Sequence, residues 1–309
     1  MRSDVRLTSS DPDIRRLAIL NAIELDEQEA LAIIIAGFQD VSSDVRAEAA
    51  RAIAEIPGEH MLLPLLKLLE DDNQDVRNVA ADTLAECNQE GLLKVYEEWL
   101  GRDNPFVKAS VLRAIKPLRI RSAATYALNG LHDSSEHVRL ESAGVLGYLQ
   151  DPSYLPYLAN VASADENTDV RRTAMGALGY SLCPETLSAV SHGLKDDAWQ
   201  VREEAAVTIA RLKAVEAGNQ LIQVISTEPY WQVIAKVLVA LGKIKSREAV
   251  EEVEHMLFHS VSNVRKEAAI CLGEIGDPRA IGSLREALMD RDPDVKKLAA
   301  WAIAKIETE

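Results

Sequence analysis

Apolar residues recur along this chain with the spacing of α-helices. After Val45, further apolar residues follow at +4, +5, +7, +8 and +11, ending at Ile56. This pattern is typical of a helix with a broad apolar face. A second amphipathic segment precedes each such helix, as at residues 61–70 and 279–290. The pattern therefore predicts helical hairpins, each made of a helix A followed by a helix B.

The first apolar residue of helix B, here called the anchor, recurs ten times and numbers the repeats 1 to 10. The anchors are Ile14, Val45, Val76, Val107, Val138, Val170, Val201, Val233, Val264 and Val295. They follow one another at intervals of 31 or 32 residues. One hairpin cannot bury its own apolar face, so neighbouring repeats must stack. We predict an all-α solenoid, a right-handed superhelix of nineteen helices forming one domain over 1–309, with a half repeat at 1–26. The ten anchors are expected at equivalent buried positions.

A basic residue directly follows the anchor in nine of the ten repeats. These residues are Arg15, Arg46, Arg77, Lys108, Arg139, Arg171, Arg202, Arg265 and Lys296, and Ile234 takes the place in repeat 8. A basic stripe that binds an acidic polymer is one interpretation. The recurrent Asp just before the anchor, as in Asp44 and Asp75, favours another, a ladder of ion pairs within or between repeats.

Composition narrows the functional classes. The 309 residues include 34 Lys and Arg against 49 Asp and Glu, a net charge of −15, which argues against general nucleic-acid binding. Cys87, Cys183 and Cys271 are isolated and encode neither a disulfide framework nor a Cys-based zinc site. No run of 18 apolar residues and no secretory leader is present, so we predict a cytoplasmic protein without a membrane span.

The middle of the B helices holds the main candidate site, which we expect on the concave face of the solenoid. Two glycines at +6 each cost roughly 1 kcal/mol relative to Ala, two tyrosines follow at +10, and arginines flank them. The predicted site comprises Arg113, Gly144, Tyr148, Gly176, Tyr180 and Arg211. Tyr and Arg are frequent anchors of binding sites. Alternatively, the glycines admit bulky side chains from the next repeat.

Two further groups stand out. Trp199 and Trp231 lie on successive A–B turns, where they form a second binding patch or fold over the ends of their hairpins. His255 and His259 have the spacing of metal ligands on one helix face, but no third ligand is evident, which makes an outer-face or packing role the favoured interpretation. The sequence contains no known catalytic or phosphate-binding motif, so no catalytic residue and no cofactor is predicted.

Residues 277–306, DPRAIGSLREALMDRDPDVKKLAAWAIAKI, resemble the HEAT-like repeat first recognised in phycobilisome lyase subunits. Residues 44–56 and 263–281 carry the same signature. The resemblance implies an armadillo-type α-solenoid, in a family that includes chromophore lyases, scaffolds and partner-binding proteins. The related deoxyhypusine hydroxylases hold iron with His-Glu pairs; this sequence has no such pair, which disfavours that activity.

Three functions follow from these observations. The first is a non-enzymatic scaffold that binds a protein or peptide on its concave face. The second, implied by the resemblance, is a bilin lyase or chromophore-handling subunit, in which Tyr148 and Tyr180 stack on a tetrapyrrole and Arg113 or Arg211 holds its propionates. The third is an inhibitor or immunity-type protein with one dedicated partner.

Overall fold

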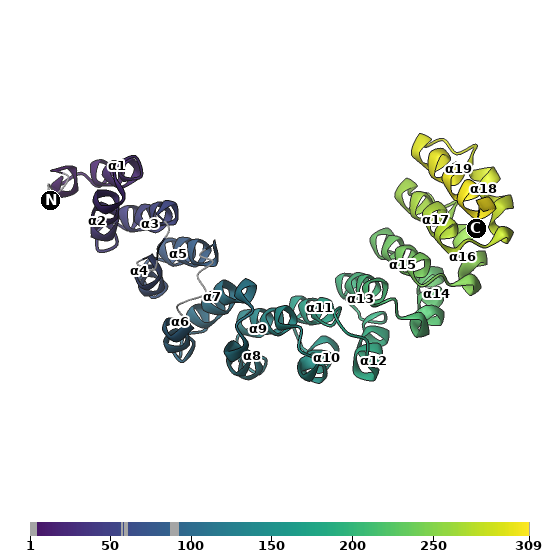
Figure 1. Ribbon diagram of the computed structural model, residues 1–309, viewed down its shortest axis with the longest axis horizontal. Coiled ribbons are helices and arrows are strands. Elements are labelled where there is room, and N and C mark those ends of the chain that lie inside the picture. The colour runs from purple at the N-terminus through teal and green to yellow at the C-terminus, as the bar shows by residue number, and fades with distance from the viewer. Residues whose placement is uncertain (1–4, 57, 59–60, 87–92, 309) are drawn as a thin grey trace. The chain divides into compact units, whose positions relative to one another are not determined.

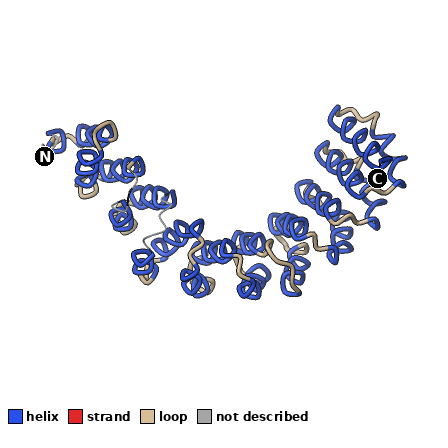
Figure 2. Tube along the Cα trace, viewed as in Figure 1, coloured by secondary structure: helices blue, strands red, loops and turns tan. Residues whose placement is uncertain are grey.

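The computed structural model describes residues 5–56, 58, 61–86 and 93–308, and these form helices and connecting loops without a strand (Figures 1 and 2). Within this part of the chain there are nineteen α-helices, which confirms the predicted class and number. No helix among the described residues combines the length and the apolar character needed to cross a membrane.

The odd-numbered helices are the B helices and the even-numbered ones the A helices. The B helices are α1 (Pro12–Ala22), α3 (Ser43–Ala52), α5 (Gln74–Glu86), α7 (Pro105–Ile115), α9 (Glu136–Leu149), α11 (Thr168–Ala177), α13 (Trp199–Leu212), α15 (Trp231–Lys243), α17 (Ser262–Ile275) and α19 (Pro293–Thr308). The A helices are α2 (Glu27–Gly37), α4 (Leu62–Leu68), α6 (Leu93–Leu100), α8 (Ala124–Gly130), α10 (Leu155–Ala164), α12 (Pro184–Gly193), α14 (Gly218–Thr227), α16 (Val250–Met256) and α18 (Ile281–Ala287).

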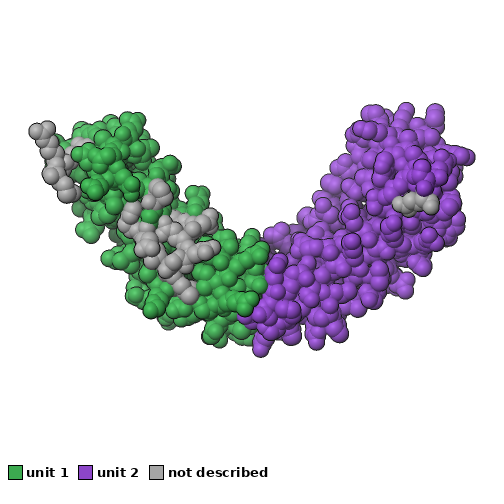
Figure 3. All heavy atoms as spheres, in the orientation of Figure 1, with its two compact units in different colours: residues 1–149 green, residues 150–309 purple. Residues whose placement is uncertain are grey.

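The chain divides into two compact units, residues 1–149 and residues 150–309 (Figure 3). In each unit, consecutive B helices pack against one another and most A helices pack on the B helix that follows them. Each unit is thus a stack of helical hairpins. The single domain over 1–309 stays a prediction.

The anchors form the buried spine of each stack. Nine of them are at most 1% exposed, as predicted, whereas Ile14 is 42% exposed. The expectation that all ten anchors are buried was therefore wrong for Ile14. Elsewhere the anchor side of helix B faces its own helix A; a Cβ built on Gly130 of α8, for example, would lie 3.4 Å from Val138. Among the described residues no helix A precedes α1, so the Ile14 side chain lacks this cover.

The basic ladder joins successive repeats. Nε and Nη2 of Arg171 donate to the two carboxylate oxygens of Asp196 at 2.7 and 2.8 Å, and Nη1 donates to the Asp165 carbonyl at 2.9 Å. Each pairing connects helix B of one repeat with the A–B turn of the next. The pairs are Arg15–Asp40, Arg46–Asp71, Lys108–Asp133, Arg171–Asp196, Arg202–Glu228 and Arg265–Asp290.

The acidic partner differs from the predicted one. It lies five residues before the anchor, not one residue before it, because this position is in the turn that faces the preceding repeat. The same carboxylate also closes its turn: Asp40 accepts the backbone N–H of Ser42 at 2.8 Å. The hydrogen bond from Arg15 holds the pKa of Asp40 below its usual value. The ladder contacts are thus intramolecular, as the structural interpretation predicted.

The ladder is interrupted at repeat 8, where both the basic residue and its acidic partner are replaced. Ile234 replaces the basic residue and is buried, and His259 replaces the carboxylate in the next turn. Nδ1 of His259 accepts the backbone N–H of Val261 at 3.1 Å, which is the contact that Asp or Glu makes in other turns. This imidazole therefore caps a turn, in line with the favoured packing role.

Candidate functional site

The B helices of the first unit line a groove made of two hollows. One hollow, of about 350 Å³, lies over α1, α3 and α5, and the other, of about 590 Å³, lies over α5, α7 and α9. They share Asn78 and Asp82, so they meet on α5. We call this surface the B-face groove; its lining includes Arg16, Asp44, Arg51, Gln74, Asn78, Asp82, Phe106, Arg113, His137, Leu140 and Glu141.

The groove uses the +6 positions that the sequence singled out. Arg51, Asp82 and Arg113 occupy +6 in three successive repeats, and all three line it. Nη1 of Arg113 lies 3.0 Å from Oδ1 of Asp82, which joins α7 to α5. Both side chains are largely exposed, at 47% and 68%, so water screens this pair and it contributes little to stability. Both charges are available to a partner.

Gly144 and Tyr148 lie on α9 of the same unit. A Cβ at Gly144 would lie 2.9 Å from Cδ of Lys116, whose ammonium is 2.8 Å from Oε2 of Glu141. The Lys116 stem thus occupies the space above the glycine, but it comes from the preceding repeat and not from the next one, which the packing alternative named. The Tyr148 side chain is exposed.

The other half of the predicted six-residue site belongs to the second unit. A Cβ at Gly176 would lie 2.9 Å from Oε1 of Glu204, and Nη1 of Arg211 donates to the Gly176 carbonyl at 3.1 Å. Side chains of repeat 7 therefore cover this glycine too. Each half is described within its own unit, and the binding role of the six residues stays a prediction.

Tyr180 does not lie on the helical stripe that the sequence predicted. Helix α11 ends at Ala177, so the tyrosine lies beyond the helix and the expectation was wrong. Its hydroxyl donates to the Asp151 carbonyl at 2.8 Å, and burial raises the pKa of Tyr180 to about 12. The ring is therefore a packing element between two turns of the second unit.

Trp199 and Trp231 are the first residues of α13 and α15. The Trp199 ring stacks on Tyr230 of the next turn, with centroids 5.6 Å apart, and Cζ of Arg202 lies 5.8 Å from the Tyr230 ring. Trp199 thus packs on the turn of the next repeat, whereas the packing alternative placed each indole over the end of its own hairpin. Trp231 is exposed. The binding role of both residues stays a prediction.

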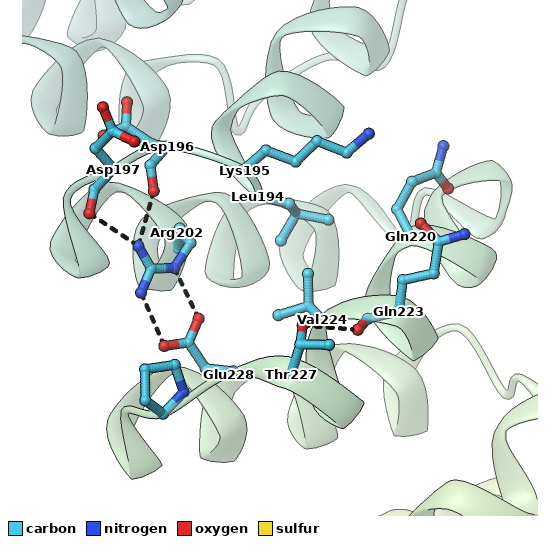
Figure 4. A pocket seen from close by; sticks show the side chains of 11 residues that line it. Leu194, Lys195, Asp196, Asp197, Arg202, Gln220, Gln223, Val224, Thr227 and Glu228 are labelled. Carbon is cyan, nitrogen blue, oxygen red and sulfur yellow. Dashed lines mark hydrogen bonds and ion pairs between the residues drawn. The ribbon is translucent and has the colours of Figure 1, made fainter.

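A hollow of about 430 Å³ opens between α12 and α14, near the same turns (Figure 4). Leu194 and Val224 give it an apolar floor, and the Arg202–Glu228 ion pair forms one end. Gln220 and Gln223 project from α14 towards it (Figure 4). These amides can bond a peptide backbone.

The model of the family described as HEAT repeats matches residues 4–85, 124–210, 156–235 and 218–304. The chain belongs to the HEAT-repeat family. The finer phycobilisome-lyase label stays a prediction.

This HEAT-repeat chain is similar to curated proteins from two flies. It is 24% identical over 241 residues to deoxyhypusine hydroxylase of Drosophila pseudoobscura pseudoobscura, covering 63% of this chain and 78% of that protein. The Drosophila melanogaster protein of the same name is 25% identical with equal coverage. Because these relatives are enzymes, the comparison leaves the catalytic status of this chain open.

Solved structures share the fold. An engineered protein aligns over 97% of both chains with a TM-score of 0.56 and 20% identity. A chain from the structure of Kap95p with RanGDP aligns with 97% of this chain and 51% of its own length, with a TM-score of 0.62 and 13% identity. At these identities the likeness concerns the fold alone.

The residues do not fit the iron centre that the hydroxylase resemblance implies. The sequence has no His-Glu pair, and among the described residues no three His, Cys, Asp or Glu side chains could hold one metal ion. His255 is exposed, and His259 uses Nδ1 to cap its turn.

The three cysteines differ in their surroundings. Burial raises the pKa of Cys271, and Cys183 is half-buried. Cys87 lies outside the described residues.

Proposed function

We propose that this HEAT-repeat protein is a non-enzymatic scaffold that binds a protein or peptide partner in the B-face groove of its first unit. The observation that carries the proposal is the run of two adjoining hollows over five consecutive B helices. Both signs of charge line it, from Arg51 and Arg113 to Asp44 and Asp82. A partner with alternating charges is favoured, because complementary charges fix orientation and register.

An extended peptide suits this groove better than a compact small ligand. The lining is open and follows the stack, and the amides of Gln74 and Asn78 can bond a peptide backbone. Phe106 and Leu140 provide apolar contacts within the larger hollow. Most binding energy is therefore expected from a few central contacts around Asp82 and Arg113, with the rest supplying shape.

The two alternatives gain less support. The tetrapyrrole proposal depends on Tyr148 and Tyr180, and the Tyr180 hydroxyl is already bonded within its unit. A dedicated inhibitor would use the same groove as a scaffold. The two functions differ in the effect of binding on the partner, since an inhibitor blocks the activity of its partner. The expected cytoplasmic location stays a prediction.

Peptide selection tests the groove directly. Peptides of random sequence, displayed on phage and selected on the full chain, are expected to yield binders whose affinity falls at least tenfold in Arg113→Glu and in Asp82→Lys, measured by fluorescence anisotropy. Each change reverses a charge at the centre of the groove. A tenfold change corresponds to about 1.4 kcal/mol, within the range of a central contact.

Lys67→Glu serves as the matched control, because this exposed lysine lies on α4 outside the groove lining. It is expected to leave the affinity unchanged. Binders that lose affinity in Trp231→Ala but not in the groove variants would move the site to the turn edge of the second unit. Selection that yields no binder to the folded parent would contradict the proposal.

A further inference from the structure

The outward face of α1 carries aliphatic side chains that no other α-helix among the described residues covers. Leu17 and Leu20 are 49% and 50% exposed. At the first turn, Oδ1 of Asp11 accepts the backbone N–H of Asp13 at 2.9 Å, and the Asp13 side chain is free of described contacts and exposed. This face combines an apolar stripe with an acidic start.

The B helix α19 begins with the same Asp-Pro-Asp sequence as α1. Its contacts show which side chain of a neighbouring repeat binds this acidic start. Residues Asp292-Pro293-Asp294 of α19 correspond to 11–13 of α1, and Asp292 accepts the Asp294 N–H at 2.9 Å. Nζ of Lys266, two residues after the anchor of repeat 9, lies 3.2 Å from Asp292 and 3.1 Å from Asp294. In this interface a lysine at +2 therefore binds the acidic start of the next B helix.

Two further contacts complete this interface between α17 and α19. Nζ of Lys305 lies 2.8 Å from Oε1 of Glu274, which pairs the +10 positions. A Cβ at Gly273 would lie 2.7 Å from the Trp301 ring, so a small residue at +9 receives a large one at +6. The stacking rule of this one interface is thus +2 on the acidic start, +10 on +10, and +9 on +6.

The outward positions of α19 match those of α1 by the same rule. Lys297 is at +2 and would meet Asp11 and Asp13. Ala304 is a small, exposed residue at +9 and would receive Leu20 at +6. From this match we infer that copies of the chain associate head to tail, with α19 of one copy stacking on α1 of the next as α19 itself stacks on α17.

The +10 contact is not carried over in the same way. Glu24 is exposed but lies beyond the end of α1 at Ala22, whereas Glu274 and Lys305 both lie within their helices. One ladder contact is not reproduced, because Ser9 stands where other turns carry the carboxylate that pairs with the residue at +1. The contact between copies is therefore weaker than the contact between repeats.

A head-to-tail contact uses different surfaces on its two sides, so it leaves both ends of a dimer free to continue. Unless the geometry closes a ring, association is open-ended. Sedimentation velocity on the full chain in about 0.15 M salt, where exposed charges remain partly effective, tests this. The weight-average mass is expected to rise with protein concentration without stopping at the dimer.

Three single variants and one double variant locate the contact. Lys297→Glu and Asp13→Lys are each expected to raise the dissociation constant at least tenfold, because each places like charges opposite one another. The chain carrying both changes is expected to recover association, since the two exchanged charges again face each other with opposite signs. Leu20→Glu, at an exposed position, is expected to abolish association.

Lys195→Glu is the matched control, an exposed lysine in the second unit away from α19, and it is expected to associate like the parent. Arg113→Glu is also expected to associate normally, which separates this test from that of the groove. Circular dichroism establishes that each variant is folded. A parent that stays monomeric at every concentration, a mass that stops at the dimer, or association unaffected by Lys297→Glu would each overturn the inference.

Discussion

Replacing Arg171 with alanine is expected to lower the free energy of unfolding by about 2–3 kcal/mol. The guanidinium donates two hydrogen bonds to Asp196, and a further one to the Asp165 carbonyl. The side chains of Arg171 and Asp196 are only 15% and 7% exposed, so water replaces these bonds poorly. The substitution also leaves the Asp196 carboxylate in a nearly dry turn with only the hydrogen bond from the Ala198 N–H of the three that it accepts. Urea denaturation followed by circular dichroism measures the change.

Arg77→Ala is the matched control. Within the described residues its hydrogen bonds go to the carbonyls of Asp71 and Asp72 in its own A–B turn, and Arg102 stands where the next turn would carry a carboxylate. The expected loss of stability is therefore about half as large as that for Arg171. Equal losses in the two variants would show that bonds to the turn, not the ion pair between repeats, carry the effect.

The sequence predicted the stack because one repeat constrains the next. An anchor every 31 or 32 residues admits one arrangement, in which equivalent apolar faces meet, and nine anchors are buried accordingly. The acidic partner of the ladder was missed, although Asp40, Asp71 and Asp196 recur five residues before an anchor. The pattern that could have revealed this partner is the constant separation of 25 residues between each of these aspartates and a preceding arginine. The nearer Asp before the anchor obscured it.

The candidate site was less predictable because side-chain conformation decides what a glycine exposes. The sequence places Gly144 on the correct helix. It cannot show that the Lys116 side chain lies over this glycine, where its ammonium forms an ion pair with Glu141. Tyr180 was misplaced because α11 ends earlier than the repeat average, at Ala177. The groove itself follows from the +6 column, whose members Arg51, Asp82 and Arg113 were visible in the sequence as charges of alternating sign.

Acid is expected to unfold the stack steeply below about pH 4. The hydrogen bonds from Arg15 and Arg265 hold the pKa values of Asp40 and Asp290 below that of an unfolded Asp, which is about 3.9. A lowered pKa stabilises the folded state fully above the unfolded pKa. This stabilisation is lost as the pH falls through the lower, folded value. Because several repeats carry such a pair, the losses accumulate over one narrow range.

Two glutamates act in the opposite direction. Burial raises the pKa values of Glu204 and Glu267, so their ionisation costs stability at neutral pH and this cost disappears as the pH falls through the raised values. Stability is therefore expected to rise slightly as the pH falls from neutral, before the steep loss. The melting temperature, measured between pH 3 and pH 8, reports both the slight rise and the steep loss. Glu204→Gln is expected to reduce the rise and to leave the steep loss unchanged.

The variant Arg171→Ala links the two predictions. Burial alone would raise the pKa of Asp196, but the hydrogen bonds from Arg171 and from the Ala198 N–H outweigh it and lower the pKa. Without the arginine, the opposing effect of burial gains weight, so Asp196 contributes less to the acid limb. The stability of this variant is therefore expected to depend less steeply on pH below about pH 4 than that of the parent. If the stability of the variant is lower than that of the parent by the same amount at every pH, the ladder stabilises the fold through packing and not through charge.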